Sequence, residues 1–218
     1  EFLGNKSLVS MNECDRCNTF LADRYEDHLS KWFGPMRTVS QIAGKGGVPT
    51  YKDKDRDKGG RVRIEMGDEG LHVSIVDADL MSQLSKEGPI AFTLPVDTPS
   101  QPYVPIRAAM ALVKIGCSVC PASELSACAP AIDWLMGRLS ARVSMFPVLY
   151  AFTPGPNPYG TGKVMLLRRK TDEPIPYLWG ILATANYRFQ FFLPFCPTDG
   201  WLKNGGESTF TTRQFPVP

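Results

Sequence analysis

The sequence predicts an α+β protein in which two or three helices pack on a mostly antiparallel sheet. Residues 19–33 and 104–119 repeat apolar side chains at helical spacing, and residues 123–139 do so with an interruption at Pro130. The last third of the chain alternates apolar and polar side chains in short runs separated by turn residues. Short runs of this kind are typical of consecutive antiparallel strands. Helices on one face of such a sheet define the α+β class.

The composition is that of an ordinary globular protein. Hydrophobic residues make up 43% of the 218, charged residues 21%, and the formal net charge is +2, so charge alone favours neither nucleic acid nor membrane. No apolar run reaches the ~18 residues of a membrane helix. Six unevenly placed cysteines do not resemble a secreted disulfide scaffold, and no signal peptide is recognisable. We therefore expect a cytoplasmic protein without a membrane partner.

The first residues of the chain read as the middle of a longer segment. The chain begins with Glu1 and Phe2 and not with methionine. We expect a processed or truncated product, or the ordered part of a longer protein, although Glu-Phe is also a common cloning remnant.

Cys14 and Cys17 form the one motif near the start whose spacing alone suggests chemistry. A Cys-x-x-Cys turn places two sulfurs on one side of the backbone, as in half of a tetrahedral zinc site. Both residues are therefore candidate structural zinc ligands, and two further ligands are needed. A redox pair or two unpaired thiols are the alternatives.

A helix is predicted to follow this motif over residues 19–33. Asn18 is a plausible N-cap, and Gly34-Pro35 ends the helix. His28 lies at the edge of the apolar face, where a packed or half-exposed side chain is favoured over a metal ligand. The predicted apolar face comprises Leu21, Tyr25, Leu29 and Trp32, and the predicted solvent face comprises Asp23, Glu26, Asp27 and Lys31.

The motifs of this region resemble a known family. Residues 3–6 (Leu-Gly-Asn-Lys), the Cys14-x-x-Cys17-Asn18 unit and a helix containing Glu26 are similar to the second half of a zinc-containing bacterial HNH endonuclease module. In that family, a first Cys-x-x-Cys and a Glu-His-x-x-Pro segment precede the Leu-Gly-Asn stretch. The resemblance implies the remnant of a ββα-metal or treble-clef module in residues 1–43. Shorter similarities fall in residues 32–37, 44–49 and 103–135.

This resemblance also implies a function. HNH modules use a histidine to activate water and a divalent cation, commonly magnesium, to stabilise the cleaved phosphodiester of DNA. The corresponding histidine is not found in the 218 residues, so the chain alone is expected to be inactive. Asn18 would hold or orient the catalytic metal, or serve only as a cap. Asn12 or Asn5 would be the middle asparagine. Nucleases of this family often serve in defence against foreign DNA.

Residues 44–60 are predicted to be a linker loop between this module and a C-terminal α+β accessory domain, residues 61–218. Lys45 and Lys52 are candidate phosphate contacts, although alternating aspartates favour a solvated loop. Within the accessory domain, two alternating stretches around a Gly-Asp-Glu-Gly turn predict a hairpin at residues 61–76.

The predicted helix over residues 104–119 contains two features of interest. Lys114 lies near its apolar face and is expected to reach solvent, with contact to an anionic ligand as the alternative. Cys117 and Cys120 repeat the Cys-x-x-Cys spacing and are expected to pack as small hydrophobes, although a composite zinc site with Cys14 and Cys17 is open. The predicted inward stripe is Ile106, Met110, Val113 and Cys117, with Leu112 beside it.

The remaining strands of the accessory domain surround one basic cluster. Arg168 and Arg169 are candidate nucleic-acid contacts, or else only solvated. No Ser-His-Asp set, phosphate loop or suitably spaced carboxylate pair is recognisable in the sequence. The predicted strands are residues 90–94, 145–152, 163–169, 177–183, 187–195 and 209–215.

Two hypotheses from different classes follow. The first is an HNH-type, zinc-containing DNA endonuclease without its general-base segment, whose accessory domain binds nucleic acid, a ligand, a partner subunit or a second copy. The second is a non-catalytic binding or assembly module in which a zinc knuckle is purely structural.

Overall fold

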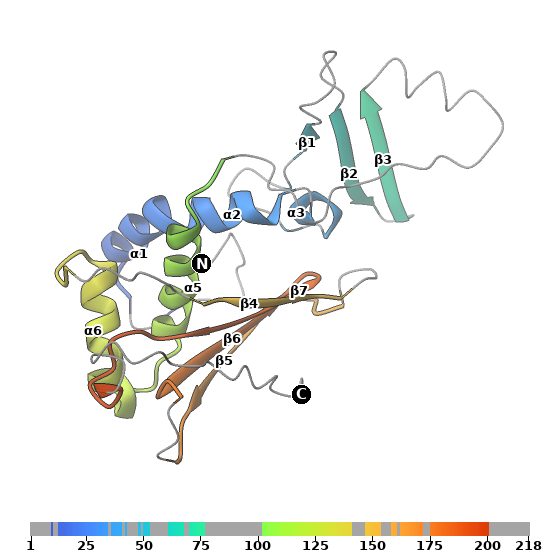
Figure 1. Ribbon diagram of the computed structural model, residues 1–218. Coiled ribbons are helices and arrows are strands. Elements are labelled where there is room, and N and C mark those ends of the chain that lie inside the picture. The colour runs from blue at the N-terminus through green and yellow to red at the C-terminus, as the bar shows by residue number, and fades with distance from the viewer. Residues whose placement is uncertain are drawn as a thin grey trace.

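The α+β class is confirmed by a computed structural model of the chain. It describes residues 10, 13–34, 36–40, 42, 48, 50–52, 61–67, 70–76, 102–140, 147–153, 158–160, 162–171 and 175–200. Figure 1 shows helices packed against a four-stranded antiparallel sheet, with a separate three-stranded sheet beyond α3. The helices are α1 (Asp15–Leu21), α2 (Asp27–Phe33), α3 (Met36–Val39), α5 (Pro105–Ser118) and α6 (Leu125–Leu135).

The first helical run is longer than predicted and is interrupted by a π-helical turn. The segment η1 (Ala22–Glu26) joins α1 to α2 without a break, so the chain is helical from residue 15 to 33. The prediction that Asn18 caps this run is wrong, because the helix begins earlier and Cys14 is its N-cap. The run ends at Gly34, as predicted, with a φ of 53° that glycine adopts without steric cost.

Helix α5 occupies the centre of the molecule. It lies between the α1–α2 run and the four-stranded sheet, and it also contacts α6 (Figure 1). Because neighbours cover it on several sides, the predicted single stripe is too narrow. Ile106 remains 37% exposed, whereas Ala111, Leu112 and Ile115 are buried. Pro105 begins the helix, where its missing amide costs no hydrogen bond.

Helix α6 continues through Pro130, where the sequence predicts a break. A short 3-10 turn, η2 (Ala122–Glu124), precedes it. Across the helical layer, the buried hydroxyl of Tyr25 donates a 2.7 Å hydrogen bond to the carbonyl of Leu135. This bond fixes the first helical run against the end of α6.

The main sheet has the strand order β4-β7-β6-β5. Strands β5, β6 and β7 form the predicted antiparallel meander, but β4 pairs with β7 at the far edge and not with β5. Strand alternation alone does not specify this order. The strands are β4 (Leu149–Phe152), β5 (Lys163–Arg168), β6 (Leu178–Thr184) and β7 (Tyr187–Phe192).

The smaller sheet contains the predicted hairpin, formed by β2 (Arg61–Gly67) and β3 (Gly70–Val76). Strand β1 (Tyr51–Lys52) pairs antiparallel with β2. The prediction of a loop throughout residues 44–60 is therefore wrong at these two residues. The predicted strands at 90–94 and 209–215 lie outside the described residues.

Aromatic side chains join the first helical run to the main sheet. Trp32 packs edge-to-face on Tyr187 and Phe189, with ring centroids 5.0 and 5.1 Å apart, and Phe33 is fully buried beside them. Throughout the part of the chain that the structure describes, no helix is both long and apolar enough to cross a membrane.

We predict that Gly180→Ala destabilises the fold by about 1–3 kcal/mol, because overpacking of a filled core costs free energy of that order. Gly180 lies opposite the fully buried Phe191 in the sheet, and an added Cβ would overlap the Phe191 ring. Urea unfolding measures the loss. Gly200→Ala is the control, since nothing lies within 4 Å of its added Cβ. Equal stability of the two variants would contradict this account of the sheet's packing.

Candidate functional site

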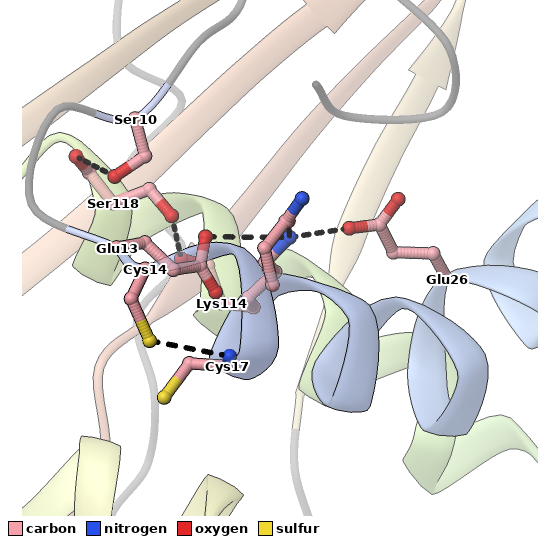
Figure 2. Close-up of polar contacts among 8 residues, drawn as sticks. Ser10, Glu13, Cys14, Cys17, Glu26, Lys114 and Ser118 are labelled. Atoms are coloured by element: carbon pink, nitrogen blue, oxygen red, sulfur yellow. Dashed lines mark hydrogen bonds and ion pairs between the residues drawn. The ribbon is translucent and has the colours of Figure 1, made fainter.

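The two cysteines of the first motif lie side by side where α1 begins. Cys14 is exposed and Cys17 partly so, and neither is in a disulfide. The Cys17 amide donates to the Cys14 sulfur at 3.4 Å, and the Asn18 amide donates to the Cys14 carbonyl at 2.9 Å. Figure 2 shows both sulfurs on the same side of the turn. We call residues 14–17 the dithiol turn.

The two thiols of the dithiol turn differ in acidity. Hydrogen bonds from Cys17 hold the pKa of the Cys14 thiol below its ordinary value, because they stabilise the thiolate. The pKa of Cys17 is raised, chiefly because its thiol is bonded to Cys14 and must donate to it. Cys14 is therefore the more readily ionised of the pair, as a metal ligand or a nucleophile requires.

Lys114 of α5 lies directly behind the dithiol turn. The prediction that it reaches solvent is wrong: its side chain is only 5% exposed and its ammonium lies 2.6 Å from Glu26 Oε1. It also donates to Asn18 Oδ1 at 2.7 Å. Glu13 Oε2 lies 3.6 Å from the ammonium, and Figure 2 shows Glu13 and Glu26 on either side of Lys114. We call Lys114, Glu13, Asn18 and Glu26 the lysine cluster. A buried ammonium requires such partners, because an unpaired one would lose its hydration.

Glu26 was expected on the solvent face and is instead buried. The cause is local. The π-helical turn places more residues in one turn than an α-helix does, and this rotates the end of η1 toward α5. The α-helical spacing on which the expectation rested therefore does not hold at Glu26.

Asn18 does not lie free at the surface as a ready metal ligand. Its side-chain oxygen accepts from the Lys114 ammonium, and a cation in that position opposes binding of a second cation by the same oxygen. The catalytic assignment of Asn18 stays a prediction. Asn12 and Lys45, also predicted to be functional, lie outside the described residues, as does Asn5. Lys52 falls in the short strand β1.

Glu13 precedes the dithiol turn and is mostly buried. One of its carboxylate oxygens, Oε1, has no hydrogen-bond partner among the described residues. Burial raises the pKa of Glu13, and the nearby Lys114 ammonium opposes this rise. The lysine cluster thus contains two carboxylates for one ammonium.

A cavity of about 350 Å³ adjoins the dithiol turn. Cys117 contributes to its wall, and burial raises the pKa of that thiol to about 12. Cys120 is joined to Cys128 in a disulfide, so the composite zinc site with Cys120 is wrong. No group of three or more His, Cys, Asp or Glu side chains within the described ranges is placed to hold a metal. Within the described ranges, the dithiol turn supplies two free thiols to the wall of this cavity.

His28 is half-buried, as expected, and its contacts are structural. Its Nδ1 accepts from the Val104 amide at 3.0 Å, and the Arg107 guanidinium lies 3.3 Å from Nε2. Burial lowers the pKa of His28, and the charge of Arg107 lowers it further. The histidine stabilises the start of α5 in its neutral form.

Both arginines of the predicted basic cluster form ion pairs within the chain. Arg168 pairs with Glu124 at 2.6 Å. The Arg169 side chain is only 8% exposed and bonds to Asp199 and to the carbonyl of Ile175. These contacts favour a structural role for Arg169, because its guanidinium is turned away from solvent.

The chain matches no known family model, no curated protein and no solved structure.

We predict that alkylation distinguishes the free thiols. At pH 7–8, iodoacetamide should modify Cys14 first and leave Cys117 unmodified, because the thiolate reacts and the pKa of Cys117 is about 12. Raising the pH should increase labelling of Cys17 next. Peptide mass spectrometry of the metal-free chain, at a series of pH values, measures the order. Labelling of Cys117 before Cys14 would contradict the site described above.

Proposed function

We propose that the chain is part of a metal-dependent DNA endonuclease of the HNH type, in which Cys14 and Cys17 are two ligands of a structural zinc. The observation that supports this most directly is the dithiol turn: two free thiols, adjacent, accessible, and placed where a helix begins. Such a turn is the usual form of half a tetrahedral zinc site. The motif resemblance supplies the reaction class.

In this proposal the chain holds the zinc on one side only. Cys14 and Cys17 supply two thiolates, and two further ligands come from outside the described residues. The zinc would stabilise the fold of the module without touching DNA, as structural zinc sites do. The readily ionised Cys14 fits this role because a thiol must lose its proton to bind the metal.

Cleavage of DNA would need groups beyond the dithiol turn. A divalent cation such as magnesium would supply stabilisation of charge at the phosphodiester. Asn18 comes directly after the dithiol turn, but its side-chain oxygen is bonded to Lys114. In this proposal Asn18 therefore orients the dithiol turn and does not bind the divalent cation. The general base would be a histidine that the 218 residues do not supply. A cytoplasmic location belongs to this proposal, but the Cys120–Cys128 disulfide opposes it, because disulfides are rare in reducing compartments.

A second function is supported by that same bond. Because the Asn18 side-chain oxygen is bonded to the buried Lys114, the dithiol turn also suits a module that binds a partner or a second copy without catalysis. Under this alternative the zinc is present but no DNA is cut.

We predict that the full-length product of the gene, which would contain the two further ligands, binds about one zinc per molecule. Cys14→Ser should lose this zinc, because one of its thiolates is removed. Elemental analysis by mass spectrometry measures the content. The control is Cys117→Ser, which alters a thiol in the wall of the same cavity and should retain the metal. Unchanged zinc in Cys14→Ser would end the proposal.

We also predict that the complete coding product nicks supercoiled plasmid only when a divalent cation is present. The 218 residues alone should not, because a metal without its base loses most of the rate. Gel analysis with magnesium and with EDTA tests both statements. Zinc without nicking in any divalent cation would favour the non-catalytic alternative, and nicking by the 218 residues alone would refute the assignment of the missing base.

A further inference from the structure

The lysine cluster contacts both sides of the dithiol turn. Glu13 comes immediately before Cys14, and Asn18 comes immediately after Cys17. The Lys114 ammonium lies 3.6 Å from the first and 2.7 Å from the second, measured to their side-chain oxygens. Lys114, which is 96 residues after Asn18 in the sequence, thus joins the two ends of a four-residue turn.

The position of that cation is itself fixed. Val113 and Ile115, the neighbours of Lys114 on α5, are 0% and 3% exposed and belong to the main core. The ammonium is further bonded to Glu26, at 2.6 Å, on the other side. It cannot move toward solvent without separating from three oxygens, so α5 determines where the dithiol turn sits.

We propose that Lys114 is a positioning residue, which fixes the orientation of the Cys14 and Cys17 thiols before a metal arrives. This inference rests on the proposed zinc role of the two cysteines. If the turn is ordered by folding, its conformational entropy is not lost again when the metal binds. Residues that orient metal ligands through hydrogen bonds commonly alter metal affinity by about 10–100-fold when they are removed.

Charge and position predict opposite effects of removing Lys114. An ammonium close to a divalent cation repels it, so the charge alone would make Lys114→Met bind metal more tightly. Loss of orientation would make the same variant bind more weakly. The sign of the change in affinity therefore separates the two.

The matched variants are Lys114→Met and Glu26→Gln. Both break the same buried ion pair, but only the first removes the contacts beside the cysteines. Cobalt(II) titration of the complete coding product, followed through its thiolate-to-metal absorption, gives the affinity. Lys114→Met should bind about 10-fold more weakly, the lower end of the usual range, because Lys114 acts on the cysteines through Glu13 and Asn18. Glu26→Gln should lose less affinity, because the amide oxygen of the new side chain still accepts from the ammonium. Tighter or unchanged binding in Lys114→Met, or an equal loss in both variants, would overturn the proposal.

A second variant tests the proposal even if Lys114→Met does not fold. Asn18→Ala removes the acceptor beside Cys17 and leaves the pair of Lys114 with Glu26 in place. It should weaken cobalt binding in the same direction as Lys114→Met, by a smaller factor. Unchanged affinity in Asn18→Ala would count against positioning through this contact.

A metal-independent measurement separates this inference from the proposed function. Phenylarsine oxide binds only where two thiols can reach one arsenic atom, so its rate of uptake reports the orientation of Cys14 and Cys17. If the unmodified protein binds no cobalt, the zinc proposal fails, but slower uptake in Lys114→Met than in Glu26→Gln would still support positioning. Equal uptake in both variants would overturn it.

Discussion

The buried ammonium of Lys114 is the constraint on which the arrangement of this molecule depends. It lies where the first helical run, the dithiol turn and the central helix α5 meet, and it binds oxygens of Glu26 and Asn18 at 2.6 and 2.7 Å. Removing one partner of a buried ion pair typically costs about 3–5 kcal/mol. Few single contacts in a domain of this size have so large an effect on stability. The placement of the two thiols thus depends on the same contacts that hold the helical layer together.

Periodicity predicts most elements of the fold. The apolar repeat of residues 104–119 gives α5 to within one residue at each end, and alternation gives β5 and β6 nearly as closely. These signals are local, because side chains three or four apart share one helix face and side chains two apart share one sheet face. The dithiol turn is recognisable for the same reason. Its two cysteines are three positions apart, and this spacing is enough to bring the sulfurs together.

Relations between distant segments could not be predicted in this way. Lys114 and Glu26 are 88 residues apart, and a lysine near an apolar face is equally consistent with a side chain that reaches solvent. The π-helical turn changes the phase of the helix, so the face assigned to Glu26 was wrong. The pairing of β4 with β7 is likewise set by tertiary packing. The sequence thus points to Lys114, Asn18 and Glu26 separately, but the contacts that bring them together depend on the folded chain.

A buried ion pair contributes less to net stability than its short distances suggest, because the loss of hydration offsets the attraction between the charges. An apolar pair of similar volume would fill the same space. It would not, however, select one orientation, whereas an ammonium with oxygens of Glu13, Asn18 and Glu26 around it is constrained in direction as well as in distance. This directional constraint falls on the two residues that flank the dithiol turn. The lysine cluster is thus better explained by the orientation of two thiols than by the stability of the core.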